Sequence, residues 1–289
     1  MSIKKLISAS IAAALLTTVC AQALARDIVM GLIPAESNEE MINKFEPMRA
    51  YLEKKLGAKV KVFTATDYSG VIEAMRKKRI DIAWFGPLSY TLAEQEAGAE
   101  AFAVGVMTNG KSTYKSYFVV PGDSPAKTLM DLKGKSAAFV DPASTSGGLM
   151  PTYLLKKETG MTPQEFFGKF TWTGSHDAAE MAVKNKTVDV AADNNITYPM
   201  MISKGLISTE SNRVLMESPD LPGSPLCYRK DLPDNLKTKI RDAILTAHND
   251  IKVSGYGNII RYDGVTPADY QPIRDMVKEL GLKKEQMLK

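Results

Sequence analysis

Residues 73–83 have the sequence EAMRKKRIDIA, which predicts the end of a helix, a basic turn and a short buried strand. Residues 181–191, MAVKNKTVDVA, repeat this order and again place an aspartate between aliphatic residues of the strand. Chance can produce so short a match, and so can two similar lobes of alternating helices and strands. Alternation of this kind is typical of an α/β fold.

The segments before the first copy continue the alternation. Residues 27–33 and 60–63 are short apolar runs of the kind found in buried strands. Between them, apolar residues recur three and four positions apart over residues 42–56, which indicates a helix that ends at Gly57. We therefore expect sheets of mainly parallel strands covered by helices.

The second half of the chain has the same character. Residues 136–140 and 188–192 are predicted strands, and residues 149–156 are a predicted helix. Residues 218–225, SPDLPGSP, are rich in proline and predict an irregular segment that crosses between lobes. Apolar spacing over residues 236–251 then predicts a long amphipathic helix.

The composition is that of a folded globular protein. The chain has 289 residues, of which 44% are hydrophobic and 24% charged, so it can bury a core and is not disordered. Its net charge is +4, and positive and negative side chains alternate along the sequence. Because no basic stripe is present in the sequence, we expect no nucleic-acid partner.

Residues 1–25 have the features of a cleavable export signal. Two lysines precede an apolar run over residues 6–19, and an Ala-x-Ala motif predicts cleavage before Arg26. The run is too short for a membrane span, which needs about 20 apolar residues. Lipid attachment at Cys20 is left open. Cys227 is the remaining cysteine after cleavage, so we expect no internal disulfide.

The segment with the clearest chemistry is residues 139–149, FVDPASTSGGL, where a predicted strand is followed by a polar turn and a helix. N–H groups in the first turn of a helix are unpaired and carry partial positive charge. The hydroxyls of Ser144, Thr145 and Ser146 add donors, and two following glycines allow close approach to the backbone. This pattern predicts a cradle for a tetrahedral oxyanion. The alternative is a Ser/Thr cap that only completes the helix.

The sequence gives little support for catalysis. It has no Gly-x-Ser-x-Gly nucleophile motif, and His176 and His248 are its two histidines. Two histidines and one mature thiol without close spacing do not form a zinc-binding pattern. Hydrolysis by a metal ion or by a catalytic triad is therefore poorly supported by the residues. His176 opens a predicted helix, where a structural role is as common as a functional one.

Five short segments occur in an order and spacing that resemble the phosphonate- and phosphite-binding periplasmic proteins of ABC transporters. They are residues 67–70 (DYSG), 81–87 (DIAWFGP), 144–147 (STSG), 174–176 (GSH) and 188–194 (VDVAADN). The resemblance implies a type II periplasmic binding fold, in which two α/β lobes are joined by a two-segment hinge. It implies that lobe 1 comprises residues 26–115 and 222–289, that lobe 2 comprises residues 116–221, and that the ligand lies between them.

The resemblance also implies a set of ligand-binding residues. Members of the family hold phosphonate oxygens with a serine- and threonine-containing turn and a histidine, and they place aromatic side chains at the cleft. The corresponding residues here are Tyr68, Tyr114, Ser144, Thr145, Ser146 and His176. For both tyrosines, ordinary packing is the alternative. Asp193 follows the fifth segment's strand and could accept a hydrogen bond from a protonated ligand oxygen; the alternative is a cap for the next helix.

Two positions depart from relatives that bind aminoalkylphosphonates. Those relatives place acidic residues beside the ligand's ammonium group, and this sequence has Ile196 and Ser224 there. Because a buried ammonium without a partner is costly, the expected ligand is phosphite or a small phosphonate such as methylphosphonate.

The resemblance therefore implies a monomeric periplasmic receptor of an ABC importer, which is not an enzyme and needs no metal or cofactor. Such a receptor closes its lobes around the ligand and docks on a permease in the inner membrane. One alternative is a receptor for another oxyanion, such as phosphate, a sulfonate or a phosphorylated metabolite. Others are a periplasmic phosphonate hydrolase and a ligand-sensing partner of a signalling receptor.

Overall fold

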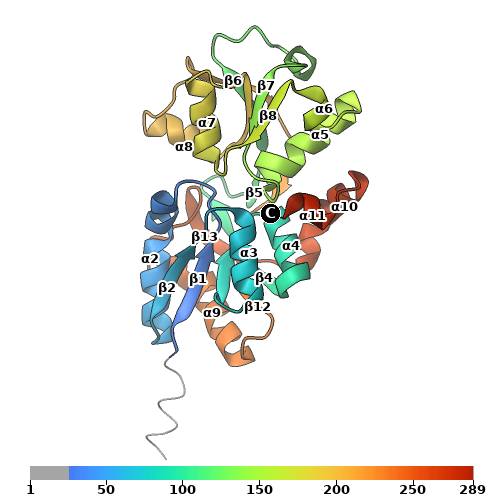
Figure 1. Cartoon of the computed structure of the whole chain (residues 1–289). Coiled ribbons are helices and arrows are strands. Elements are labelled where there is room, and N and C mark those ends of the chain that lie inside the picture. Colours follow the sequence, from blue (N-terminus) through green and yellow to red (C-terminus); the bar gives the residue numbers. More distant parts are fainter. Residues whose placement is uncertain (1–25, 289) are drawn as a thin grey trace, which may run out of the picture.

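Strands and helices alternate in the structure as the sequence predicts, and they build two separate sheets (Figure 1). The structure, a computed structural model, describes residues 26–288. The predicted export signal and Cys20 lie outside these residues. We call the part around the six-stranded sheet the first lobe and the part around the five-stranded sheet the second lobe.

The first lobe contains both chain ends of the described region. Its sheet has the order β13-β4-β12-β3-β1-β2. The strands are β1 (Ile28–Leu32), β2 (Val60–Thr64), β3 (Ile82–Trp84), β4 (Ala99–Met107), β12 (Pro225–Arg229) and β13 (Ile259–Gly264). The helices are α2 (Asn38–Leu56), α3 (Tyr68–Arg76), α4 (Pro87–Ala97), α9 (Asp234–Thr246), α10 (Gln271–Glu279) and α11 (Lys284–Met287).

The second lobe is formed by the middle of the chain. Its sheet has the order β10-β6-β9-β7-β8. The strands are β6 (Ser116–Pro121), β7 (Ser136–Phe139), β8 (Lys169–Trp172), β9 (Val190–Asn194) and β10 (Asn212–Glu217). The helical segments are η3 (Thr145–Leu149), α5 (Met150–Thr159), α6 (Pro163–Phe166), α7 (His176–Lys184) and α8 (Thr197–Ser203).

Two crossing segments connect the lobes. They contain the short strands β5 (Thr113–Tyr114) and β11 (Leu221–Pro222), which pair antiparallel. The two segments approach so closely that a Cβ added to Gly223 would lie 2.1 Å from the carbonyl oxygen of Ser112. Glycine is therefore required at this position of the proline-rich segment.

The expectation of mainly parallel strands is wrong, because both sheets are mixed. β1 pairs parallel with β2 and β3, and β7 with β8 and β9, but β12, β4 and β13 pair antiparallel, as do β10, β6 and β9. The reason lies in the crossings. We call the junction between the lobes, marked by β5 and β11, the waist. The parallel strands end at the waist, and β6 and β12 begin there. A strand that starts at the waist must run opposite to one that ends there.

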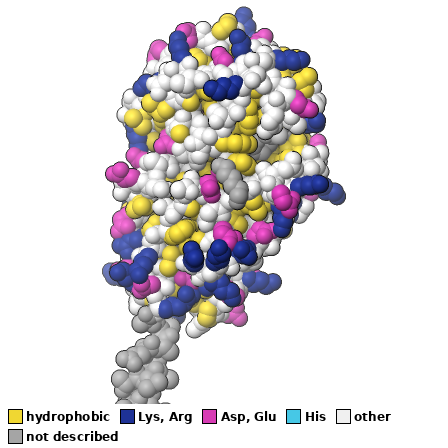
Figure 2. All heavy atoms as spheres, viewed as in Figure 1, with side chains coloured by type: hydrophobic (Ala, Val, Ile, Leu, Met, Phe, Trp, Pro, Cys, Tyr) yellow, Lys and Arg dark blue, Asp and Glu magenta, His cyan; other side chains and the backbone are white. Residues whose placement is uncertain are grey.

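The core and the surface are those of a protein with well-packed lobes. The larger hydrophobic cluster includes buried residues of both lobes, and a second cluster around Phe139 and Phe166 lies within the second lobe. Figure 2 shows basic and acidic side chains interspersed over one face. Among residues 26–288, no helix has both the length and the apolar character that a membrane crossing requires.

Candidate anion-binding site

Four helical segments begin at the waist between the lobes, each just after a strand of a parallel pair. α3 begins at Tyr68, α4 at Pro87, η3 at Thr145 and α7 at His176. Ligands of open α/β sheets bind at the carboxyl ends of the strands, where such helix starts gather. Each start carries a partial positive charge, so their convergence favours an anion.

A small cavity lies at this point. Hydroxyl groups, aromatic rings and His176 dominate its lining, which comprises Ile33, Ala35, Tyr68, Trp84, Gly86, Tyr114, Ser144, Thr145, Ser146, His176, Asn194, Ser224 and Tyr256. Six of the seven residues expected from the sequence are among them. Within the described chain, no lysine, arginine, aspartate or glutamate lines the cavity. Its walls therefore offer dipolar donors instead of a full positive charge.

The Ser-Thr-Ser turn has a wide first turn. The N–H of Leu149 donates to the carbonyl oxygen of Ser144 over 2.9 Å, which makes the turn one residue wider than that of an α-helix. The Ser144 hydroxyl accepts a hydrogen bond from the Gly147 N–H at 3.1 Å. Ser144 thus performs the capping that the sequence left as an alternative, and the hydroxyls of Thr145 and Ser146 also line the cavity.

Packing within the second lobe requires glycine at both positions that follow the Ser-Thr-Ser turn. A Cβ added to Gly147 would lie 2.3 Å from a methyl carbon of Val140. One added to Gly148 would lie 2.4 Å from the Asp141 carbonyl oxygen. These contacts show that the glycines let the turn pack against the end of β7. Close approach of a ligand to the backbone is not needed to explain them.

Hydrogen bonds across the waist hold the two lobes together. The Leu88 N–H, in the first turn of α4, donates to the Thr145 hydroxyl at 2.8 Å. The His176 N–H donates to the carbonyl oxygen of Ala35 at 2.9 Å. Both pairs join the first lobe to the second, so the structure has the lobes in contact around the cavity.

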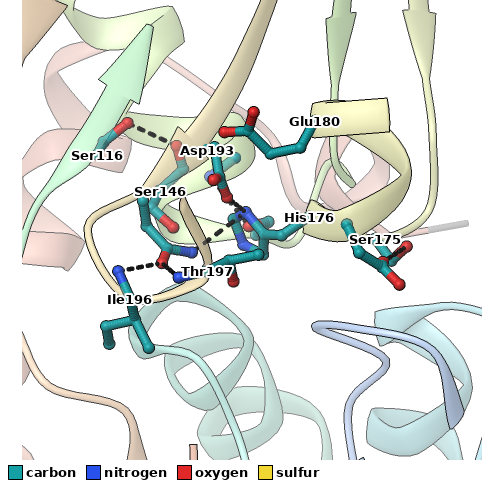
Figure 3. Close-up of polar contacts among 12 residues, drawn as sticks. Ser116, Ser146, Ser175, His176, Glu180, Asp193, Ile196 and Thr197 are labelled. Atoms are coloured by element: carbon teal, nitrogen blue, oxygen red, sulfur yellow. Dashed lines mark hydrogen bonds and ion pairs between the residues drawn. The ribbon is translucent and has the colours of Figure 1, made fainter. Parts of the chain in front are cut away.

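His176 is buried, and its ring faces an acidic neighbour. Its Nδ1 lies 2.8 Å from Oδ1 of Asp193, as Figure 3 shows, and 3.2 Å from the amide nitrogen of Asn194. Burial lowers the pKa of His176 to about 4, although nearby carboxylates act in the opposite direction. The ring is therefore neutral at pH 7. A proton on Nδ1, donated to Asp193, leaves Nε2 as a hydrogen-bond acceptor.

The structure places Asp193 behind His176, outside the cavity lining. Burial raises the pKa of Asp193 above its ordinary value, whereas a hydrogen bond with Glu180 lowers it. Asp193 does not cap the following helix. Oδ1 of Asn194 performs that role, accepting from the N–H groups of Ile196 at 2.9 Å and Thr197 at 2.8 Å.

The two expected tyrosines reach the Ser-Thr-Ser turn from the first lobe and from the crossing segment. Burial raises the pKa of Tyr68, and a hydrogen bond with Ser144 acts in the opposite direction. Burial also raises the pKa of Tyr114 to about 12, opposed by hydrogen bonds with Thr145 and Ser146. Both phenols therefore keep their proton at neutral pH and can donate it in a hydrogen bond.

A second small cavity adjoins the first. The two share the lining residues Trp84, Tyr114, Ser224 and Tyr256. The adjoining cavity is otherwise lined mainly by apolar and aromatic side chains, including Ile196, and within residues 26–288 no acidic side chain lines it. Both cavities are small, with volumes of only ≈ 10 Å³ for the first and ≈ 30 Å³ for the second. The space suits a ligand of a few heavy atoms.

Sequence reasoning missed several residues of the cavity. Trp84 ends β3 just before α4. The rule that ligands bind where a parallel strand ends and a helix begins, which located the Ser-Thr-Ser turn after β7, could also have found Trp84. Tyr256 lies in an irregular loop that has no periodic signal. Its ring lies 5.0 Å from that of Trp84, and its hydroxyl accepts from the Asn194 amide at 3.0 Å and contacts the Thr197 hydroxyl at 2.5 Å. Among residues 26–288, no group of metal-ligating side chains forms a candidate metal site.

Residues 30–272 match the family described as ABC transporter, phosphonate, periplasmic substrate-binding protein. The chain is 37% identical over 216 residues to the Phosphonates-binding periplasmic protein of Escherichia coli. The aligned region covers 73% of this chain and 63% of the Escherichia coli protein, which is less than two thirds of that protein's length. It is 28% identical to the Phosphate-import protein PhnD of Mycolicibacterium smegmatis, over 97% of each chain.

Two solved structures have the same overall arrangement. One is a binding protein component of an ABC phosphonate transporter from Pseudomonas aeruginosa, with a TM-score of 0.80, 29% identity, and coverage of 86% of this chain and 85% of that one. The other is PhnD1 from Prochlorococcus marinus in complex with methylphosphonate, with a TM-score of 0.78, 24% identity, and coverage of 88% and 98%. These likenesses confirm the type II periplasmic binding fold.

Proposed function

This chain belongs to the family of periplasmic substrate-binding proteins of phosphonate ABC transporters, and from that premise we propose that it binds phosphite or a small phosphonate such as methylphosphonate. The Ser-Thr-Ser turn and His176 would bind the oxyanion, and Tyr68 and Tyr114 would complete the ligand site through their hydrogen bonds to the turn. The observation that carries this proposal is the cavity at four helix starts, lined by hydroxyl and imidazole groups. Such dipolar donors suit a tetrahedral oxyanion.

The size and charge of the two cavities support a small, uncharged substituent on phosphorus. Ile196 and Ser224 line the adjoining cavity, and the resemblance places them where aminoalkylphosphonate receptors have acidic residues. An ammonium group that entered would lose its water without gaining a carboxylate partner. A hydrogen or a methyl group needs no such partner, and an apolar wall accommodates it.

The closed arrangement supports a receptor that delivers its ligand to a permease. Hydrogen bonds from Leu88 to Thr145 and from His176 to Ala35 can form only when the lobes meet. Ligand-induced closure would therefore present a defined surface to the transporter at the inner membrane. The relatives are transport proteins, and we infer that this chain acts likewise as a monomeric periplasmic receptor without a cofactor and not as an enzyme.

Phosphate is a second candidate ligand. The relative that aligns over 97% of both chains is named a phosphate-import protein. The first cavity, with its ring of hydroxyls, offers as many donors to four oxygens as to three. The adjoining apolar cavity favours the methyl group or hydrogen over a fourth oxygen, because an oxygen there would lose hydrogen bonds to water.

Titration calorimetry with phosphite, methylphosphonate, phosphate and aminoethylphosphonate tests the proposal. We expect phosphite or methylphosphonate to bind at least about tenfold more tightly than phosphate, a difference of about 1.4 kcal/mol. Phosphorus NMR of the recovered ligand should show it intact. Tighter binding of phosphate would assign the protein to phosphate, and turnover of a phosphonate would overturn the assignment as a receptor.

A further inference from the structure

Two carboxyl groups face one another behind the cavity, and neither was expected to do so from the sequence. Glu180 lies on α7 one turn after His176, and Asp193 lies on β9; both side chains are fully buried. Figure 3 shows the carboxyl group of Glu180 directed toward Asp193, whose other side meets His176. The three groups form a row that ends at the cavity.

Each carboxyl group has one oxygen without a hydrogen-bond partner. Oε2 of Glu180 accepts from the amide of Asn212 at 2.6 Å, and Oδ1 of Asp193 pairs with His176. Among the described residues, no donor contacts Oε1 of Glu180 or Oδ2 of Asp193. Two ionised carboxylates cannot donate to each other, so this arrangement would leave two buried charges facing one another without compensation.

We propose that Glu180 carries a proton and donates a hydrogen bond to the Asp193 carboxylate, and that Glu180 thereby acts as a positioning residue that fixes the proton pattern of His176 at the oxyanion site. One proton placed between the two carboxyl groups gives a partner to both oxygens. The role toward the oxyanion rests on the proposed function, whereas the protonation of Glu180 does not.

The shared proton determines what the cavity offers to a ligand. With Glu180 protonated, Asp193 keeps a single negative charge and accepts a hydrogen bond from the Nδ1–H of His176. Nε2 is then an acceptor, which suits the P–OH group of a monoanionic ligand. A dianionic ligand needs a donor instead, so its binding requires one proton from solution on Nε2. In either case, the complex holds one proton between His176 and a ligand oxygen.

Other charged groups surround this row. The titratable side chains nearest to it from the packed elements are Glu36, Lys44, Tyr117, Asp177, Tyr198 and Tyr256. Glu36 is paired with Lys44, and Asp177 accepts from the Ser37 N–H at 3.1 Å, so both acids have partners of their own. Burial raises the pKa of Glu180 well above its ordinary value, and the charge of Asp193 raises it further.

Thermal unfolding as a function of pH tests the proton on Glu180 without any ligand. A carboxyl group that is protonated in the fold and ionised when unfolded makes the folded state bind the extra proton, so stability falls as pH rises above the ordinary value of 4.5. Glu180→Gln keeps a donor and cannot titrate. We expect the Tm of Glu180→Gln minus that of the parent to grow steadily between about pH 5 and 8. Glu158→Gln, on the exposed face of α5, is the matched control and should show no such trend.

A second measurement uses the unaltered protein, in case the variant fails to fold. Carbon-13 NMR of protein labelled at glutamate carboxyl groups should show one glutamate that is still protonated at pH 7, and Glu180→Gln should remove that signal. A constant Tm difference from pH 5 to 8, or the absence of a protonated glutamate at pH 7, would each overturn the proposal.

The consequence for binding is measured separately. Glu180→Leu, which cannot donate to Asp193, should weaken binding of phosphite at pH 7 by about fivefold or more, and Glu180→Gln should restore it to within twofold. If Glu180 were ionised, Glu180→Gln would remove a negative charge near the oxyanion and would tighten binding beyond the parent. If neither phosphite nor methylphosphonate binds the parent, the proposed function fails while the pH-dependent unfolding still tests Glu180.

Discussion

The two walls of the cavity have different chemistry. The wall from the second lobe consists of the Ser-Thr-Ser turn and His176, with the buried acids Glu180 and Asp193 behind it. The wall from the first lobe consists mainly of the aromatic side chains Tyr68, Trp84 and Tyr256. On the proposed function, the second-lobe wall would supply hydrogen bonds to the charged ligand, and the first-lobe wall would supply shape and a closing surface.

This difference predicts that the two lobes contribute unequally to the free energy of ligand binding. Hydrogen bonds to a charged group contribute about 1.5–3 kcal/mol each, and those between neutral groups contribute about 0.5–1.5 kcal/mol. Substitutions in the second-lobe wall should therefore reduce affinity more than substitutions in the first-lobe wall.

The largest effect is expected from the Ser-Thr-Ser turn. Thr145→Val keeps the shape of the side chain but removes the hydroxyl, which both lines the cavity and accepts from the Leu88 N–H at 2.8 Å. We expect the affinity for the oxyanion to fall by about 1.5–3 kcal/mol in calorimetry, and Ser144→Ala and His176→Ala to fall in the same range. Thr171→Val, at an exposed position of β8, is the control and should change nothing. Affinities within twofold of the parent for all three variants would place the oxyanion elsewhere.

Selectivity against an ammonium group should come next in size. Aminoethylphosphonate should bind at least about tenfold more weakly than methylphosphonate, because Ile196 and Ser224 cannot pair with its charge. The double variant Ile196→Glu, Ser224→Asp should narrow this gap by improving the larger ligand and repelling the small anion. Full exchange of preference is not expected, since the cavity stays small. Equal affinity of the parent for the two phosphonates would contradict the assignment of both positions.

Local sequence patterns predicted much of the fold, and they failed where the outcome depends on distant segments. Each apolar run after residue 26 that was expected to be a strand forms one, and the helix over residues 42–56 begins four residues earlier than the spacing indicated. The reversed direction of β6 and β12 was not predictable from their own residues. It follows from where the chain crosses between the lobes, which periodicity does not encode.

The candidate site was predictable only in part, for the same reason. The Ser-Thr-Ser turn stands out because three hydroxyls follow one another at a helix start. The position of Asp193 behind His176 depends on which face of β9 meets α7. Glycine at position 147 is required because Val140 packs closely against it. Glu180 has no sequence signal at all, because an acidic residue in an amphipathic helix ordinarily faces solvent.

A moderate effect on ligand affinity is expected from Asp193, the acid that contacts His176 behind the second-lobe wall. Since His176 has a pKa of about 4, it stays neutral from pH 5 to 8, and the pH dependence of binding should follow the ligand's own second ionisation, near pH 6 for phosphate esters. Affinity should fall as pH rises past that value, because the complex then has to take up a proton. Asp193→Asn should weaken binding at low pH by about 1 kcal/mol and flatten the profile. A flat profile in the parent would show that no proton is held between His176 and the ligand.

The smallest effect is expected from the first-lobe wall. Tyr68→Phe removes one phenol hydroxyl that hydrogen-bonds to Ser144 across the waist and leaves the ring in its buried position. We expect affinity to fall by only about 0.5–1 kcal/mol, because the lost bond joins two neutral groups. Closure should survive, since the Leu88–Thr145 and His176–Ala35 hydrogen bonds are untouched. Small-angle scattering should therefore show that saturating phosphite reduces the radius of gyration of the variant as much as that of the parent. A loss larger than that of Thr145→Val, or a variant that binds without compaction while the parent compacts, would mean that the aromatic wall controls affinity or closure, contrary to the division between the two walls.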